Sequence, residues 1–440
     1  MPAERASACS ATRRCCTPAA LPEPARSTSG SWTPRPPRRS RRAPRRPDWR
    51  ASSSWRRSRR SAGRRRVPGR AGRSADRRRC RGPAGWSSSS SSSSSDDGNS
   101  RDARIESAPV SPITVEATAP TRVDLAGGTL DIWPLYLFHP GAVTVNVAID
   151  RRAWCRVETG IEGVRLESRD TLAKAEGRNV SEVLGSGGLS LAAYILRALG
   201  IESGLKVVTH SRVPAGSGLG GSSALAVAVV AAAARAVGRE LDADRMWPVV
   251  RDAEAQNMGV PAGMQDHLAA IHGGVLGIHL EPGAVRAERL ATDPARVEEC
   301  LLLVDAGVTR FSGINNWEVF KGQIDGDERV RRSLAEIAAA ARALRDALVA
   351  HEYDAVTPLM AAEWEARKRL APGVTSPEID RIAAAAQASG GAAKVCGAGG
   401  GGMVAVWAPP GRRDGVEAAV RAAGFRPVAF RLDLRGLEIE

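Results

Sequence analysis

The sequence RVPAGSGLGGSSALAVAVV, residues 212–230, places a glycine-rich loop and two serines between a strand and a helix. We expect the strand at GLKVVTH, residues 204–210, and a helix that opens at Ser222 and ends at Gly238. The free N–H groups and the dipole of a first helical turn attract anions, and glycines let oxygen atoms approach the backbone closely. The segment therefore predicts an anion site.

This loop has four interpretations, three of them with a bound phosphate ligand. The spacing of Gly216, Gly218 and Gly221 matches a dinucleotide fingerprint, but residues 238–256 run into another helix where that fold needs a second strand. A classical P-loop is excluded because the loop contains no lysine. What remains is a phosphate cradle in which Ser222 or Ser223 reaches Mg²⁺, and the alternative is a helix-capping loop with two cap serines.

Two further segments favour phosphate chemistry. Glu254 stands at the end of a predicted helix and Asp266 follows twelve residues later, after a Gly-Val-Pro-Ala-Gly turn. One carboxylate that holds Mg²⁺ and another that orients or deprotonates an alcohol are what phosphoryl transfer needs, although such pairs are commonly solvated charges. The segment 397–402 has five glycines in six positions, which indicates a close approach to a ligand.

Strands and helices alternate without a strict βαβ rhythm, so we expect an α+β fold of two lobes that meet near residue 300. The apolar patterns also predict two separate strands at 142–150 and 153–159, and a last strand at 426–433.

Taken in order, these segments resemble the GHMP kinases, a superfamily that includes galactokinase, homoserine kinase and mevalonate kinase. The resemblance rests on APTRVDLAGGTLDI (119–132), PAGSGLGGSSA (214–224), GMQDH (263–267) and KVCGAGGGGMVAV (394–406). The segments DAGVTRFSG (305–313) and EWEARKRLAPGVTSPEIDRI (363–382) place it nearest the sugar branch, among kinases similar to D-glycero-D-manno-heptose 7-phosphate kinase.

The resemblance implies a ribosomal-S5-like N-terminal lobe that binds ATP, at 111–300, and a ferredoxin-like C-terminal lobe, at 301–440. It implies ATP-dependent phosphorylation of a sugar hydroxyl, the anomeric one, with Mg²⁺ as cofactor. One departure concerns residues 127–131, which we call the acceptor loop. Here GGTLD stands in place of Gly-Gly-Gly-Thr-Asp, and Leu130 is expected to alter the pocket.

The residue roles that the resemblance implies fall into four groups. Asp266 would contact the acceptor hydroxyl, with Arg122 beside it to offset the developing charge. Ser222 and Glu254 would hold Mg²⁺. The phosphates of ATP would lie on Pro214, Gly216, Ser217, Gly218, Leu219, Gly220, Gly221, Ser222 and Ser223. The acceptor would be bound by Thr129, Asp131, Arg310, Lys368, Gly397, Gly399 and Gly400, although Lys368 has an ordinary salt bridge with Glu365 as its alternative.

The strong positive charge of the chain belongs to its first hundred residues. These contain 25 Arg, no Lys and six acidic residues, a net charge of +19, whereas the rest has 38 basic and 42 acidic residues. Residues 1–110 are rich in Arg, Ser and Pro and lack any apolar period, so we expect a disordered tail, or a stretch upstream of the true start codon. The alternatives are a nucleic-acid-binding arm and a targeting peptide.

No apolar run is long enough to span a membrane, and the seven cysteines are scattered without metal-ligand spacing. We therefore expect a cytoplasmic enzyme, monomeric or homodimeric, whose partner is a small molecule, with nucleic acid possible only through the tail. A kinase of a non-sugar alcohol and a non-catalytic sugar sensor are the competing functions.

Overall fold

The computed structural model describes residues 112–308 and 313–440. The expected tail at 1–110 and Arg310 lie outside these described residues.

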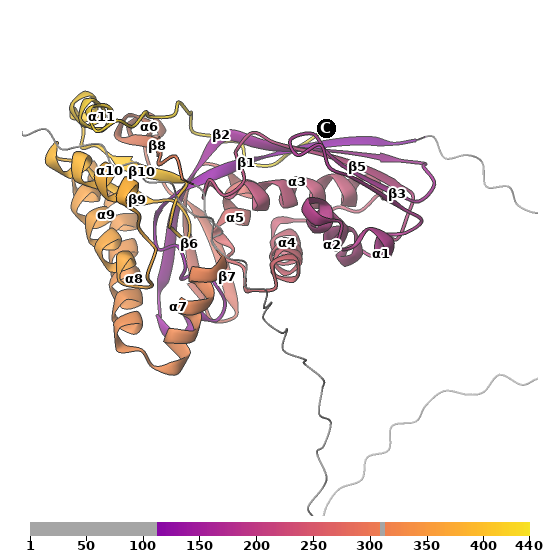
Figure 1. Cartoon of the computed structure of the whole chain (residues 1–440), viewed down its shortest axis with the longest axis horizontal. Helices are drawn as coiled ribbons and strands as arrows, with labels where there is room; N and C mark the ends of the chain where they lie inside the picture. The colour runs from indigo at the N-terminus through magenta and orange to yellow at the C-terminus, as the bar shows by residue number, and fades with distance from the viewer. Residues whose placement is uncertain (1–111, 309–312) are drawn as a thin grey trace, which may run out of the picture. The chain divides into compact units, whose positions relative to one another are not determined.

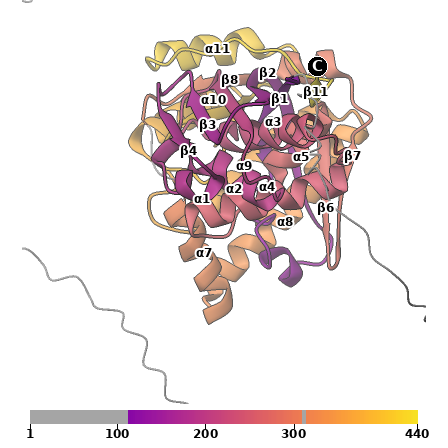
Figure 2. The ribbon, with the colours of Figure 1, turned by 90° about the vertical axis from the view of Figure 1, so that its right-hand side faces the viewer.

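The described residues form one eight-stranded sheet, in which the order of the main path is β11-β1-β2-β5-β3-β4 and β6 pairs with both β2 and β7. Its strands are β1 (Thr114–Ala126), β2 (Ala142–Thr159), β3 (Val164–Ser168), β4 (Lys174–Gly177), β5 (Leu205–Ser211), β6 (Val275–Glu281), β7 (Ala284–Arg289) and β11 (Glu438–Ile439). The helices on one face of this sheet are α1 (Val180–Val183), α2 (Ser190–Ala198), α3 (Gly221–Ala236), α4 (Ala243–Met258) and α5 (Gln265–His272), as Figures 1 and 2 show.

A second sheet of three antiparallel strands has the order β8-β10-β9. Its strands are β8 (Leu301–Asp305), β9 (Ala392–Val395) and β10 (Met403–Trp407). The other helices are α6 (Pro294–Cys300), α7 (Gly313–Asp325), α8 (Glu328–Val349), α9 (Tyr353–Lys368), α10 (Pro377–Ala388) and α11 (Arg413–Ala422). Both sheets confirm the α+β fold, and the division at residue 300 stays a prediction.

Local sequence signals explain where several helices begin. Asp242 and Asp327 accept hydrogen bonds from backbone N–H groups in the first turns of α4 and α8, and Ser376 does so ahead of Pro377 in α10. Helix α3 starts differently, because its N-cap is Gly220 in the left-handed conformation and no side chain caps it. Its first N–H groups therefore stay available for a ligand.

Two strand predictions are wrong. Residues 142–159 form the single strand β2, because Asp150 and Arg151 are accommodated as an irregularity in its pairing with β1, and the pairing resumes at Arg152. Residues 426–433 form no strand, because the segment crosses between the sheets and makes only single bridges, Val304 with Pro427 and Ile149 with Leu432. Pro427 also lacks the N–H group that a ladder would use.

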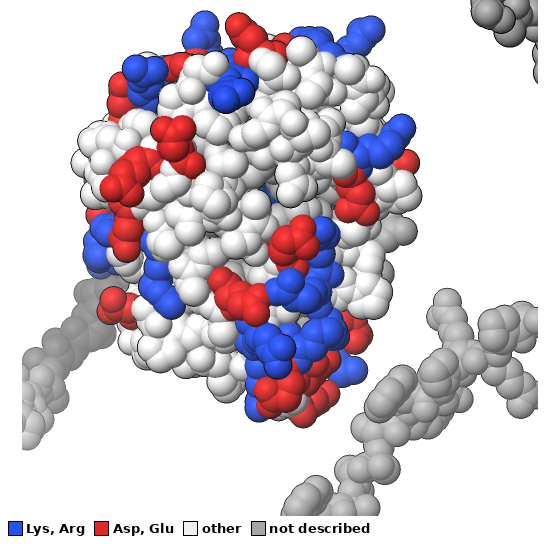
Figure 3. Space-filling view, turned by 90° about the vertical axis from the view of Figure 1, so that its left-hand side faces the viewer, with Lys and Arg blue, Asp and Glu red and all other residues white. Residues whose placement is uncertain are grey.

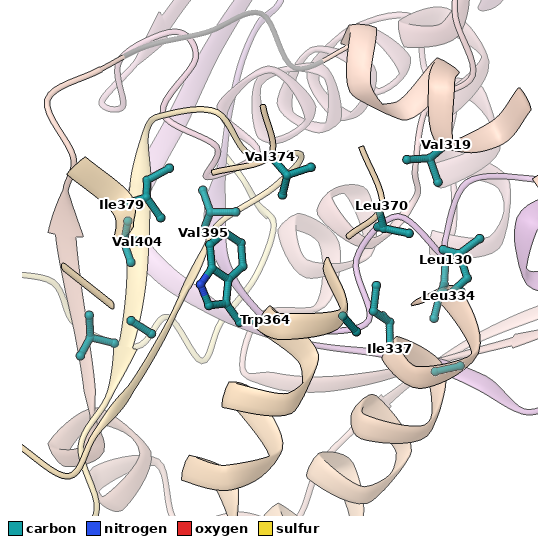
Figure 4. Close-up of a cluster of buried hydrophobic side chains, with 14 of the residues drawn as sticks. Leu130, Val319, Leu334, Ile337, Trp364, Leu370, Val374, Ile379, Val395 and Val404 are labelled. Carbon is teal, nitrogen blue, oxygen red and sulfur yellow. The ribbon is translucent and has the colours of Figure 1, made fainter. Parts of the chain in front are cut away.

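Leu130 belongs to the hydrophobic core and not to a ligand pocket. It is fully buried, and Figure 4 shows it beside Leu334 of α8 and near Leu370, in the cluster that also contains Trp364. The extra residue in GGTLD therefore anchors the loop after β1 against helix α8 and against Leu370, which follows α9.

A pair of opposite charges is buried beneath the same loop. Lys394 of β9 donates a hydrogen bond of 2.8 Å to Asp124 of β1, and neither side chain is exposed to solvent. Glu363 of α9 lies 3.7 Å from the same ammonium group. Burial of the Asp124 carboxyl would raise its pKa, but Lys394, Arg367 and Arg122 together hold that pKa below its usual range.

The surface charge of the described part is mixed. On the face that carries α8 to α10, basic and acidic side chains lie interspersed over a largely uncharged surface (Figure 3). No helix within the described residues combines the length and apolar composition needed to cross a bilayer.

We predict that Lys394→Met destabilises the protein by about 3–5 kcal/mol, because it leaves the Asp124 carboxylate buried without its partner. Urea unfolding at neutral pH measures this loss. The matched control is Lys174→Met in β4, whose side chain is exposed and whose replacement should change the stability by less than about 0.5 kcal/mol. Equal effects of the two variants would contradict the assigned role of the pair.

Candidate active site

A cavity of about 500 Å³ opens beside the glycine-rich loop. Its walls come from the loop at 213–223, the loop after β1, the end of α4 and the start of α5, with Gly397 and Ala398 following β9. This volume is in the range that binds small molecules and nucleotides.

Arg122 joins the expected catalytic acid to the glycine-rich loop. Its Nε donates to Oδ1 of Asp266 at 2.7 Å, and its Nη1 donates to the carbonyl of Gly218. The backbone N–H of Arg122 also donates to the carbonyl of Leu219 at 3.0 Å. The acid and the loop are therefore held as one unit by a single buried side chain.

The electrostatics leave Asp266 more basic than an ordinary aspartate. Burial raises the pKa of its carboxyl, and Arg122 opposes that rise without cancelling it. Burial alone would lower the pKa of Arg122, but Asp266 and Asp124 hold it above its usual range. The pair therefore consists of a charged guanidinium and a carboxylate with an increased affinity for protons.

At position 220 only glycine fits between the glycine-rich loop and the carboxylate of Asp266. Gly220 has a φ of 72°, and a Cβ atom there would lie 2.8 Å from Oδ2 of Asp266. The loop also packs against the segment after β9, because a Cβ on Gly218 would lie 2.4 Å from the carbonyl oxygen of Cys396. Much of the glycine content thus serves contact between two backbones.

The serines at the start of α3 meet Glu254. Ser223 is buried and donates a 2.9 Å hydrogen bond to Oε2 of Glu254, and the hydroxyl of Ser222, which is exposed in the cavity, also bonds this carboxylate. His267 contacts the same Oε2 at 2.6 Å. Burial would raise the pKa of Glu254, but His267 and the two serines hold it below its usual range. A carboxylate with neighbouring hydroxyls is the hard oxygen donor set that suits Mg²⁺.

Asp131 fixes the start of the helix that carries Asp266. Its Oδ2 accepts hydrogen bonds from the backbone N–H groups of Met264 at 2.8 Å and Gln265 at 3.0 Å. Burial raises the pKa of Asp131 to about 6, although these two N–H groups oppose the rise. Asp131 lines the cavity as well, so it is in place both to orient α5 and to meet an acceptor.

Thr129 has an unusual backbone conformation for a β-branched residue, with a φ of 78°. Such a conformation costs on the order of 1–3 kcal/mol and persists only where the surroundings hold it, typically at ligand sites. Thr129 lines the cavity, and its hydroxyl accepts a buried 3.2 Å hydrogen bond from Arg367.

The cavity brings together most of the predicted residues but not all of them. Gly397 lines it, whereas Gly399 and Gly400 are not among the lining residues and pack against the backbone of Val374. Leu219 belongs to the glycine-rich loop, but its side chain is buried and it does not line the cavity. The residues from the prediction that do line the cavity are Arg122, Thr129, Asp131, Pro214, Gly216, Ser217, Gly218, Gly220, Gly221, Ser222, Ser223, Glu254, Asp266 and Gly397.

Lys368 is not among the residues that line the cavity. It forms a 2.7 Å salt bridge with Glu365, which was the alternative open to it, and its ammonium group lies over the ring of Trp364. The cation of α9 that reaches the acceptor loop is its neighbour Arg367, which the sequence pattern did not single out. His267 was missed too, although it directly follows Asp266.

The fold and this site define a phosphotransferase that acts on the hydroxyl group of a small molecule. Residues 188–274 match the description "GHMP kinases N terminal domain", and residues 344–425 match "GHMP kinases C terminal". Both GHMP kinase domains are thus matched in this chain, in the order that their names give.

Relatives of known name have similar sequences. The D-glycero-alpha-D-manno-heptose 7-phosphate kinase of Campylobacter jejuni is 27% identical over 323 residues, which cover 70% of this chain and 93% of that protein. The mevalonate kinase of Thermococcus sibiricus is 26% identical over 353 residues, covering 74% and 98%. The crystal structure of a D-glycero-D-manno-heptose 1-phosphate kinase from Bacteriodes thetaiotaomicron shares the fold, with a TM-score of 0.59 at 22% identity over 74% of this chain and 98% of that chain.

The raised pKa of Asp131 predicts a pH-dependent stability. Between its unfolded pKa, about 3.9, and its folded pKa, about 6, the folded chain binds more protons, so this group lowers stability as the pH rises through that window. The variant Asp131→Asn can still accept hydrogen bonds from the α5 backbone but does not titrate. We expect its free energy of unfolding, relative to that of the wild type, to increase by about 2–3 kcal/mol between pH 4 and pH 7.5. Urea unfolding at both pH values tests this, and a difference that does not change with pH would contradict it.

Proposed function

We propose that this chain is a sugar kinase that transfers the γ-phosphate of ATP to the anomeric hydroxyl of a sugar or sugar phosphate. The observation that carries the proposal is the tie between Asp266 and the glycine-rich loop through Arg122, because it sets an acceptor of protons next to a cradle for phosphates. The similarity to the heptose 7-phosphate kinase of Campylobacter jejuni supports a sugar as the acceptor.

In this mechanism, Asp266 receives the proton of the acceptor hydroxyl while the hydroxyl oxygen attacks the γ-phosphorus and ADP departs. The raised pKa of Asp266 favours that proton transfer. Arg122 stays charged and offsets the negative charge that gathers on the transferred phosphoryl group, whose transition state is stabilised mainly by positioning and electrostatics.

The nucleotide phosphates would lie on the backbone N–H groups at 216–223, where α3 begins without a side-chain cap. Ser222 and Glu254 would hold Mg²⁺, which would offset the negative charge of the phosphate groups. Ser223 and His267 keep the Glu254 carboxylate oriented and ionised toward that position.

We place the reaction in the cytoplasm, where ATP is abundant and where the free thiols of Cys155, Cys300 and Cys396 would stay reduced. The second candidate is a kinase of a non-sugar alcohol, which the similarity to the mevalonate kinase of Thermococcus sibiricus favours.

A coupled assay of ADP release decides between these acceptors. The purified full chain is offered MgATP with free sugars, sugar 1-phosphates, sugar 7-phosphates and mevalonate in separate reactions. We expect sugar-dependent turnover. Turnover with mevalonate alone would contradict the sugar assignment, and binding of sugars without any ADP release would indicate a sensor.

We predict that Asp266→Asn lowers kcat by about 10²–10⁴-fold, because the amide cannot accept the proton. The stabilisation of the variant by MgATP in a thermal unfolding assay should match that of the wild type, since the phosphate cradle is intact. Asp244→Asn, an exposed acid at the start of the neighbouring helix α4, serves as the matched control. An active Asp266→Asn enzyme would contradict the assignment of the acid.

A further inference from the structure

The loop after β1 is held from two sides at Thr129. On one side Leu130 is fully buried in the cluster that contains Leu334 of α8 and Leu370, which follows α9. On the other side Arg367 of α9, which is 2% exposed, donates to the carbonyl of Gly128 at 2.9 Å and to Oγ1 of Thr129 at 3.2 Å. These contacts hold Thr129 in its left-handed backbone conformation at the wall of the cavity.

Arg367 is itself fixed by buried charges. Its Nε donates to Oε1 of Glu363 at 3.0 Å, and that oxygen also accepts from the backbone N–H of Gly127 at 3.3 Å. Lys394 and Asp124 complete a neutral group of two cations and two anions, all of them buried. Because the guanidinium is planar and ion-paired, its two bonds to the loop have a fixed direction.

The chemistry of a hydroxyl then decides what Thr129 offers to a ligand. A guanidinium can only donate hydrogen bonds, so the bond from Arg367 uses a lone pair of the hydroxyl and leaves its hydrogen free. Within residues 112–308 and 313–440, Thr129 Oγ1 donates to no protein acceptor. The hydrogen is therefore available to an atom in the cavity.

We propose that Arg367 is a positioning residue that makes Thr129 a hydrogen-bond donor to one oxygen of the acceptor molecule, so that the enzyme selects acceptors that carry an oxygen at that place. This inference rests on the proposed kinase function. We assign this oxygen to the acceptor because Thr129 lies two residues from Asp131, whose carboxylate holds the start of α5, the helix that carries Asp266.

The test uses the sugar that gives the fastest ADP release with the wild type, and its monodeoxy analogues. Thr129→Val keeps the shape and the β-branching of the side chain and removes the hydroxyl. We expect it to raise the KM for the sugar at least tenfold and to leave the KM for ATP within twofold. One monodeoxy analogue, which lacks the contacted oxygen, should react equally well with the wild type and with Thr129→Val. The sugar KM of Thr129→Ser, which keeps a hydroxyl, should be at least fivefold lower than that of Thr129→Val.

Arg367→Lys tests the positioning role without removing the buried charge. Its sugar KM should rise at least threefold, and the double variant with Thr129→Val should be no worse than Thr129→Val alone, because both changes act through one hydroxyl. The matched control is Arg369→Lys, an exposed residue on the same chain segment that pairs with Glu336, which should change neither KM.

Three results would overturn the inference: an unchanged sugar KM in Thr129→Val, a change confined to the KM for ATP, or additive effects of Thr129→Val and Arg367→Lys. The first step of the experiment separates this from failure of the proposed function. If no sugar supports ADP release by the wild type, the kinase assignment is wrong, and the inference that rests on it is wrong as well.

Discussion

Arg122 is the side chain on which the arrangement of the site depends. It lies in β1, and it reaches Asp266 at the start of α5 and the carbonyl of Gly218 in the glycine-rich loop. A buried guanidinium needs a partner of opposite charge, so the position of Asp266 follows from the position of β1. The acid and the phosphate cradle are consequently set by β1, which pairs with β2 along most of its length in the larger sheet.

The smaller sheet supports this unit from the other side. The backbone N–H of Met403 in β10 donates to the carbonyl of Ser217 at 2.8 Å, and Cys396 lies against Gly218. The buried charged group makes two further connections. Lys394 joins β9 to Asp124 of β1, and Arg367 joins α9 to Thr129 in the loop that follows β1. The cradle, the acid and the acceptor loop therefore share rigid supports, which favours a preorganised site.

The sequence was sufficient for the parts of the site that depend on local pattern. The strand, loop and helix around Ser222 and the helix that carries Glu254 were placed by spacing and residue type, and the fold class was predicted correctly. The role of Asp266 as the acid came from the family resemblance and stays a prediction. Long-range packing determined what was missed. A helix that carries both Arg367 and Lys368 presents them on different sides, and only the position of α9 beside β1 decides which one meets Thr129.

The glycines of 397–402 illustrate the same limit. Their number predicted a close approach, but the close neighbour of Gly399 is the backbone of Val374, which no local pattern could indicate. In the same way, the apolar run at 426–433 has the composition of a strand, yet its partners lie in two different sheets and allow it only single bridges.

The transfer of a phosphoryl group to an intact hydroxyl is the central claim, and oxygen labelling tests it most directly. The sugar that supports the fastest ADP release is labelled with ¹⁸O at the anomeric hydroxyl and converted with unlabelled ATP. The account predicts that ¹⁸O stays in the bridge between carbon and phosphorus, where ³¹P NMR detects it by its isotope shift. A sugar phosphate whose bridging oxygen is unlabelled, or ADP release that does not depend on the sugar, would contradict the account.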